Sequence, residues 1–238
     1  MAKRSKSLRT NSAGRTIKSF KGSKRTYPIK DPEALKRFIG WFDIQYRKAS
    51  GERKRQADRN RMVILTALNT AFRSEDVLQL RVCDMVDGHI SIKENKTGKF
   101  QSFDLNPGFT KMVRSYVERN QLSDQDYLFQ PRQSMSRSHS EKESKIYALP
   151  VTRVRMNQII NKAISAAGIN YSVGMHGLRK TFGYWYIKNG GNPFTLQRMY
   201  CHSMLATTER YVMWGTEDVD AARANMQIGF TTPHKKGR

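Results

Sequence analysis

The sequence predicts a mainly α-helical protein with one small antiparallel β-sheet, an α+β fold. Over most of the chain, apolar side chains recur every three to four residues, which is the spacing of one face of an α-helix. Between residues 89 and 105, apolar and polar residues instead alternate on both sides of an Asn-Lys-Thr-Gly turn, a pattern typical of a β-hairpin. A chain of 238 residues, 38% of them hydrophobic, is long enough to bury a sizeable core.

Helical spacing begins directly after Pro32 and predicts three helices before the hairpin. The first, of about four turns, carries Leu35, Phe38, Ile39, Phe42 and Tyr46 on one face, and the second carries Met62, Leu65, Leu68 and Phe72. Ser74 is a suitable N-cap for a third helix that runs through Leu80. This cap places Arg73 at a helix start, near the end of the preceding helix.

The hairpin and the helices after it follow from turn and capping residues. Lys96 falls at or near the hairpin tip. The pair Asn106-Pro107 starts a helix, and Thr152 caps another that Gly168 ends. Residues 131–145 are predicted to form a polar surface loop between these two helices. Four more helices are expected, at residues 176–188, 193–200, 206–213 and 217–227.

The charge of the chain points to a polyanionic partner. The chain has 43 Lys and Arg against 20 Asp and Glu, a formal net charge of +23 and a pI of about 10.3. Ten basic residues and no acidic one lie in residues 1–30, a segment with too few apolar residues to offset its ordering entropy. We therefore expect a disordered basic arm at 1–27, a folded domain at 28–228 and a basic tail at 229–238. Nucleic acid is the first candidate partner.

A second basic cluster follows the first predicted helix. It consists of seven side chains: Arg47, Lys48, Arg53, Lys54, Arg55, Arg59 and Arg61. The last five are the predicted DNA contacts. These side chains either lie along a phosphate backbone or belong to a solvated linker, and the pattern favours neither interpretation over the other.

Composition also excludes several classes of protein. The mean hydropathy is −0.69 and no apolar run approaches about 18 residues, so neither a transmembrane helix nor an apolar signal segment is expected. Cys83 and Cys201 lie far apart with no C-x-x-C motif, which indicates neither a disulfide framework nor a thiolate metal site. We expect a soluble, cytoplasmic protein without a metal site.

Residues that suit phosphate chemistry occur in a distinctive order. His176 and Arg179 are three residues apart, so they share one helix face. His202 is followed nine residues later by Tyr211, with Thr208 between them. Arg73 and the hairpin residue Lys96 precede both pairs. The order and spacing of the whole set are much less expected by chance than any single pair.

This set resembles the catalytic domain of the tyrosine recombinases, the phage integrase family, over residues 28–228. The R-x-x-E/D-x-x-x-L element of that family matches Arg73, Asp76 and Leu80, and its hairpin lysine in a K-T-G-K turn matches Lys96. Its H-x-x-R element matches His176 and Arg179, and its H-x(5)-T-x-x-Y block matches His202, Thr208 and Tyr211.

The resemblance implies a role for each residue. Tyr211 would attack a DNA phosphate and form a 3′-phosphotyrosine, with no metal, cofactor or ATP. Arg73, Arg179 and His202 would hold the phosphate oxygens. Lys96 would be the general acid and His176 the general base. Asp76 would support these residues, and Lys99 and Lys180 would add DNA contacts.

The same resemblance implies partners and location. It implies double-stranded DNA as substrate, a homo-oligomer of two to four copies on DNA and, as a possibility, an accessory DNA-bending protein. A bacterial host cell, a virus or a mobile element would encode such an enzyme. A C-terminal helix with Val219, Ala222, Met226 and Ile228 on one face would pack onto a neighbouring copy or onto its own domain, and the sequence leaves both open.

The sequence departs from the family pattern in two places. Most members have a helical core-binding domain ahead of the catalytic domain, whereas about 27 residues precede the expected start here, so we expect a single-domain form. The basic arm would then supply part of the DNA grip. Tyr200-Cys201 also stands before His202 where the family usually has Leu-Gly, which puts the turn geometry there in question.

Two alternatives to a site-specific recombinase remain at this point. One is a DNA-relaxing enzyme similar to type IB topoisomerases, which would use the same chemistry as a monomer. The other is a non-catalytic DNA-binding or architectural protein. The complete set of six residues argues against the second.

Overall fold

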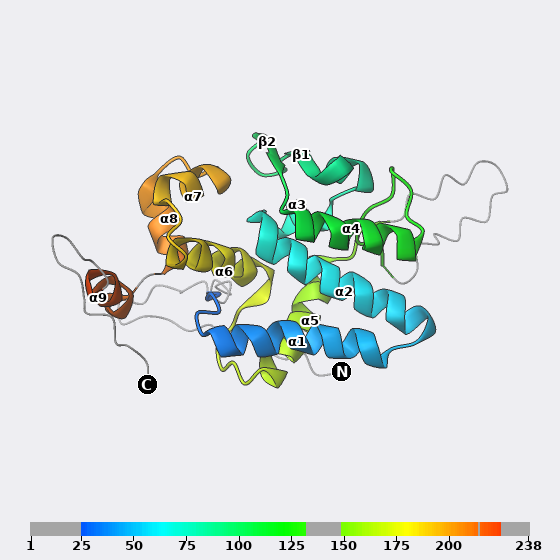
Figure 1. Cartoon of the computed structure of the whole chain (residues 1–238), viewed down its shortest axis with the longest axis horizontal. Helices are drawn as coiled ribbons and strands as arrows, with labels where there is room; N and C mark the ends of the chain where they lie inside the picture. Colours follow the sequence, from blue (N-terminus) through cyan, green and yellow to red (C-terminus); the bar gives the residue numbers. More distant parts are fainter. Residues whose placement is uncertain (1–24, 132–148, 214, 225–238) are drawn as a thin grey trace, which may run out of the picture.

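The computed structural model describes residues 25–131, 149–213 and 215–224, and it confirms a mainly helical fold with one small sheet (Figure 1). The helices are α1 (Pro32–Lys48), α2 (Gly51–Thr70), α3 (Ser74–Leu78), α4 (Pro107–Asn120), α5 (Arg153–Ala166), α6 (Gly174–Lys188), α7 (Pro193–Met199), α8 (Leu205–Val212) and α9 (Thr216–Ala224). A 3₁₀ helix, η1 (Val82–Gly88), precedes the strands β1 (His89–Lys93) and β2 (Phe100–Asp104). Residues 1–24 of the expected arm, the expected tail and most of the expected polar loop lie outside the described residues.

The antiparallel pair β1 and β2 forms the predicted hairpin. His89 pairs with Asp104 at one end and Lys93 with Phe100 at the other, so residues 94–99 connect the strands and include Lys96. Asn106 and Thr152 cap α4 and α5 as predicted, because their side-chain oxygens accept hydrogen bonds from backbone N–H groups of the first turn.

The prediction for α3 was wrong in two details. Arg73, not Ser74, occupies the N-cap position, and the Arg73 side chain makes no capping hydrogen bond. The helix ends at Leu78 rather than Leu80, because the Leu80 carbonyl accepts a hydrogen bond from the Leu128 N–H, which draws the chain into an extended pairing. The Arg73 guanidinium points toward the hairpin, where it donates a hydrogen bond to Glu94.

The linker interpretation of the second basic cluster was also wrong. Arg47 and Lys48 are the last residues of α1, and the other five members lie in the first three turns of α2, which begins at Gly51. Arg59 is 6% exposed because it precedes Met62 and Val63, both fully buried, by three and four residues on the same helix face.

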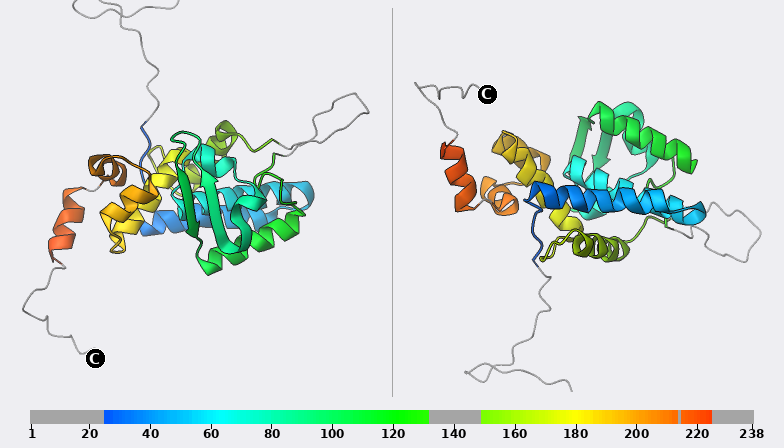
Figure 2. Two further views of the ribbon diagram at one scale, coloured as in Figure 1. Left: turned by 90° about the horizontal axis from the view of Figure 1, so that it is seen from above. Right: turned by 60° about the horizontal axis from the view of Figure 1, so that its bottom comes forward.

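Helix α2 is the centre of the molecule. The hairpin and α4 lie on one side of it, and α1 and α5 lie on the other (Figures 1 and 2). The main core contains Phe38 and Phe42 of α1, Ile90 of β1 and Ile160 of α5. A second, smaller core lies beneath α6, α7 and α8, around Tyr184, Leu196, Tyr200 and Val212. This second core supports the region where the predicted site residues gather.

An extended segment, residues 25–30, lies along α6 and precedes α1. Lys180 donates to the Thr26 carbonyl at 2.7 Å, and Trp185 donates to the Ile29 carbonyl at 2.9 Å. The Ile29 N–H donates to the Thr181 hydroxyl at 2.9 Å. Within the described residues, no helix is long and apolar enough to cross a membrane.

Candidate active site

Two arginines from distant parts of the chain meet at one backbone carbonyl. Arg179 Nη2 donates to the Tyr200 carbonyl oxygen at 2.8 Å, and Arg73 Nη2 approaches the same oxygen at 3.4 Å. Arg179 is 1% exposed, and its Nε and Nη1 have no hydrogen-bond partner among the described residues. Buried donors of this kind are nearly always satisfied, so this guanidinium is arranged to receive an anion.

His176 and Tyr211 form the second pair. His176, in the first turn of α6, has its Nε2 2.7 Å from the hydroxyl oxygen of Tyr211 on α8. Burial, and then the charges of Lys180 and Arg179, lower the pKa of His176 to about 4. The ring is therefore neutral at pH 7 and is able to accept the phenol proton.

The pKa of Tyr211 has opposing influences. Burial raises the pKa of Tyr211, and the positive charges of Arg179 and Arg73 act in the opposite direction. The Arg179 guanidinium carbon lies 5.9 Å from the centre of the Tyr211 ring. The phenol is therefore protonated in the free protein, with cations beside it to stabilise a developing negative charge.

His202 is a neutral hydrogen-bonding group beside the arginines and Tyr211. Its Nδ1 lies 3.0 Å from the buried Thr208 hydroxyl, and its ring centre is 4.9 Å from that of Tyr211. Burial and the nearby arginines lower the pKa of His202 to about 4. In a neutral ring whose Nδ1 accepts the Thr208 hydroxyl proton, Nε2 carries hydrogen and is a donor.

Sequence reasoning treated Tyr200 only as a departure from the family pattern, yet Tyr200 is a central support of the site. It is fully buried, its hydroxyl donates to the Arg179 carbonyl at 2.6 Å, and its ring centre lies 4.5 Å from the Arg179 guanidinium carbon. Gly183 makes room for this ring, because a Cβ at Gly183 would overlap the Tyr200 hydroxyl. Cys201 follows with φ of +52°, the left-handed region that favours glycine.

Asp76 holds the turn that carries Lys96. Its Oδ1 accepts from the Asn95 backbone N–H at 2.9 Å and from Asn95 Nδ2 at 3.2 Å. Asp76 is 3% exposed, and burial raises its pKa. Lys96 itself is exposed and is one of the cations that lower the pKa of His176.

The predicted DNA contacts divide into two groups. Lys99 and Lys180 lie at the site: Lys99 Nζ is 3.3 Å from the Cys201 carbonyl, and Lys180 Nζ is 5.6 Å from the centre of the Tyr211 ring. Lys180 is only 8% exposed and also bonds to the Thr26 carbonyl.

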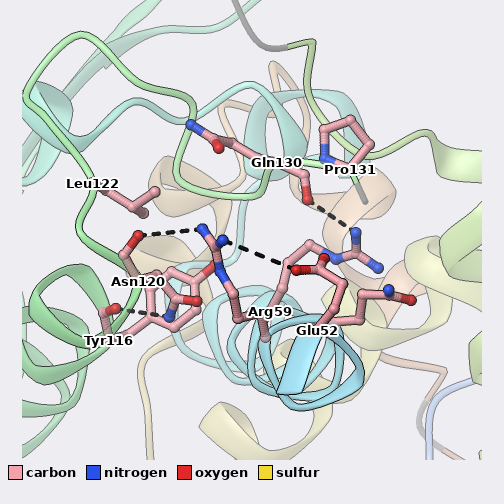
Figure 3. A pocket seen from close by; sticks show the side chains of 9 residues that line it. Glu52, Arg59, Tyr116, Asn120, Leu122, Gln130 and Pro131 are labelled. Carbon is pink, nitrogen blue, oxygen red and sulfur yellow. Dashed lines mark hydrogen bonds and ion pairs between the residues drawn. The ribbon is translucent and has the colours of Figure 1, made fainter. Parts of the chain in front are cut away.

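The structure does not bring the second basic cluster to the site, because α2 begins at the far end of the molecule from α8 (Figure 1). Arg53, Lys54 and Arg55 are exposed there. Arg59 instead donates to the Gln130 carbonyl at 2.9 Å inside a pocket formed with α4 (Figure 3), and Arg61 pairs with Asp43 at 2.5 Å.

The part of the chain that the structure describes contains no group of three or more His, Cys, Asp or Glu side chains placed to hold a metal ion. Arg73, Arg179 and Lys180 place positive charge around Tyr211, and Lys96 adds positive charge near His176. The arrangement suits a single tetrahedral anion beside the Tyr211 hydroxyl.

Residues 44–216 match the model of the phage integrase family. The chain is 26% identical over 171 residues to the probable integrase/recombinase YoeC of Bacillus subtilis (strain 168), which covers 71% of this chain and 84% of that protein.

Two solved structures are similar in fold. One is XerA recombinase, with a TM-score of 0.61 and 19% identity, covering 87% of this chain and 66% of that one. The other is XerH site-specific recombinase bound to its palindromic difH substrate, with a TM-score of 0.64 and 20% identity. That match covers 91% of this chain and 59% of the XerH chain. The described fold is therefore shared with proteins of this kind, of which this chain spans about three fifths to two thirds.

Proposed function

The chain belongs to the phage integrase family of tyrosine recombinases, and we propose that it cuts and rejoins double-stranded DNA at specific sites, for integration, excision or inversion. The observation that carries this proposal is the 2.7 Å contact between His176 Nε2 and the Tyr211 hydroxyl, next to the two converging arginines. This contact supports Tyr211 as the nucleophile, His176 as its base and the two arginines as the phosphate site.

In the cleavage step, the Tyr211 oxygen bonds to the scissile phosphorus while the bond from phosphorus to the 5′-oxygen breaks. His176 takes the phenol proton at Nε2, and Lys96 gives a proton to the departing 5′-oxygen. The products are a 3′-phosphotyrosine and a free 5′-hydroxyl. Rejoining runs the same steps backward, with a 5′-hydroxyl as nucleophile and Tyr211 as leaving group.

The arginines and His202 stabilise the pentacoordinate phosphate. No described residue accepts a hydrogen bond from Nε or Nη1 of Arg179, so these are the donors available for the phosphate oxygens, while Nη2 stays on the Tyr200 carbonyl. Arg73 and His202 Nε2 supply further donors. The energy of the broken diester is retained in the tyrosyl ester, so rejoining consumes no ATP. The proposal assigns the positive charge at the phosphate to the arginines, so it includes no metal ion or cofactor.

Strand exchange needs two DNA sites and therefore more than one copy of the enzyme. We expect dimers to tetramers on DNA, with an accessory DNA-bending protein as a possible partner, and with the basic arm contributing phosphate contacts.

The start of α9 is anchored on its own domain: Asp218 accepts from Lys30 at 3.1 Å and from the Tyr184 hydroxyl at 3.0 Å. Val219 on α9 is 41% exposed. Met226 and Ile228, also expected on this face, lie outside the described residues.

The test is covalent trapping on nicked suicide duplexes, tiled across the DNA that flanks the coding region. After cleavage, the short fragment between the cut and the nick, which carries the free 5′-hydroxyl, diffuses away. Rejoining then has no nucleophile, so the protein is captured as a DNA adduct. We expect an adduct with the unaltered protein and none with Tyr211→Phe. An adduct that survives Tyr211→Phe, or no adduct on any duplex, contradicts the proposal. A requirement for two sites separates a recombinase from a relaxing enzyme.

A further inference from the structure

Glu94 is a buried carboxylate between the hairpin and Arg73. It is 1% exposed and directly follows β1. Its Oε2 accepts hydrogen bonds from Arg73 Nη1 and from the Thr97 hydroxyl, and its Oε1 accepts one from Gln101 Nε2 at 2.6 Å. Three elements therefore meet at this side chain: the start of α3, the hairpin turn and β2.

The backbone of Glu94 also closes the turn. Its N–H donates to the Lys99 carbonyl at 2.9 Å, and its carbonyl accepts from the Gly98 N–H at 2.9 Å. Lys96 lies inside this closed loop. The residue before Lys96, Asn95, is held by Asp76, and the residue after it, Thr97, is held by Glu94.

A buried carboxylate is costly unless donors surround it. Burial acts to raise the pKa of Glu94, but the hydrogen bonds from Thr97, Arg73 and Gln101 hold it below its usual value. The carboxylate is thus ionised and places a negative charge in a site that binds a negative phosphate. Such a charge opposes phosphate binding, so its presence calls for a separate explanation.

We propose that Glu94 is a positioning residue that fixes the turn carrying Lys96 against Arg73. It thereby holds Lys96, the general acid, at a fixed distance from Arg73, which binds the phosphate. This inference rests on the proposed function. It assigns to Glu94 no contact with DNA and no proton transfer of its own.

The test replaces the 5′ bridging oxygen at the mapped scissile phosphate with sulfur. A thiolate is a far weaker base than an alkoxide and leaves without a proton. A variant whose fault is a misplaced general acid therefore recovers on the sulfur substrate, whereas a variant with a damaged fold or phosphate site does not. Lys96→Ala calibrates the assay, with slow cleavage of the oxygen substrate and recovery on sulfur.

Thr97→Val is the sharpest variant. It removes the hydroxyl that links the turn to Glu94 and that also accepts from the Lys99 N–H at 3.3 Å. It alters an exposed residue and not the partners Arg73 and Gln101 of Glu94. We expect cleavage of the oxygen substrate to be about 10-fold slower, with a sulfur-substrate rate within about twofold of the unaltered protein. Glu94→Gln gives the same pattern with a loss of about 10- to 100-fold on oxygen.

Ser102→Ala is the matched control, because Ser102 lies on β2 beside Gln101 but contacts His89 rather than Glu94. It leaves both rates unchanged. Equal loss on both substrates, or no loss on oxygen, for Thr97→Val overturns the role of Glu94 while the Tyr211 adduct of the unaltered protein still supports the proposed function. Failure of sulfur to rescue Lys96→Ala overturns the general-acid assignment and the role of Glu94 with it.

Discussion

The Tyr211 hydroxyl lies 2.7 Å from Nε2 of His176, and that imidazole is neutral at pH 7 because burial and nearby cations lower its pKa to about 4. Only the neutral ring has a lone pair for the phenol proton. His176 can therefore accept the Tyr211 proton at a pH above its own pKa, and it loses this ability as the pH falls below that pKa.

We expect the cleavage rate to fall as pH drops toward that pKa. Bound DNA adds negative charge beside the ring and raises the pKa, so the acid limb lies above about 4. His176→Gln is about 10²-fold slower and lacks this limb, since it has no group to protonate. Single-turnover adduct formation across pH measures both, and an unchanged acid limb in His176→Gln assigns the titration to another group.

Arg179→Lys separates the charge of Arg179 from its planar geometry. One ammonium cannot stay on the Tyr200 carbonyl and also offer the two donors that Nε and Nη1 provide. We expect cleavage to fall by about 10²- to 10³-fold while DNA affinity changes little. Gel-shift and adduct assays check this. Arg81→Lys, whose guanidinium bonds to the Gln125 carbonyl, is the control and keeps both. A near-normal cleavage rate in Arg179→Lys contradicts the prediction.

Cys201→Gly tests the strained turn before His202. A residue other than glycine at φ of +52° costs about 1 kcal/mol, so glycine raises the free energy of unfolding by up to that amount. Thermal unfolding gives the sign. Cys83→Gly, at a position without positive φ, lowers the melting temperature. A lower melting temperature for Cys201→Gly as well would show that its thiol packing outweighs the backbone strain.

Gly183→Ala tests the space kept for Tyr200. The added methyl group overlaps the Tyr200 hydroxyl, and crowding of this kind in a buried site costs about 1–3 kcal/mol. Because Tyr200 also carries the carbonyl that holds Arg179, cleavage falls along with stability. Adding Tyr200→Leu removes the ring and recovers part of the lost stability, measured by chemical denaturation. No recovery in the double variant places the clash elsewhere.

Most of the helices and the hairpin were predictable because they depend on local signals. The apolar residues recur at helical spacing, and the caps Asn106 and Thr152 bond to backbone N–H groups only two or three residues further on. The end of α3 was not predictable, because the Leu80 carbonyl accepts a hydrogen bond from the N–H of Leu128, far along the chain. Composition alone also cannot say which cations face water. The spacing of Arg59 to Met62 and Val63 was the available signal for its burial.

A motif in the sequence identifies the six predicted site residues, but it does not identify Glu94 and Tyr200, which hold them in place. Glu94 looks in the sequence like any polar residue near the end of a strand, and its burial depends on Arg73, 21 residues away. Tyr200 acts partly through its backbone carbonyl, which carries no sequence signal at all. Asp76 was found through the resemblance, and the structure gives its physical basis in the bonds to Asn95.

The ion pair between Lys30 and Asp218 joins positions 188 residues apart, one in the extended segment before α1 and the other at the start of α9. Tyr184 of α6 contacts both: its hydroxyl donates to Asp218, and its ring centre lies 4.9 Å from the Lys30 Nζ. Loosening of either end removes an anchor from the other. We therefore expect these two segments to open as one cooperative unit, so that amide hydrogen exchange at Tyr27, Ile29 and Lys30 changes together with exchange in residues 216–220.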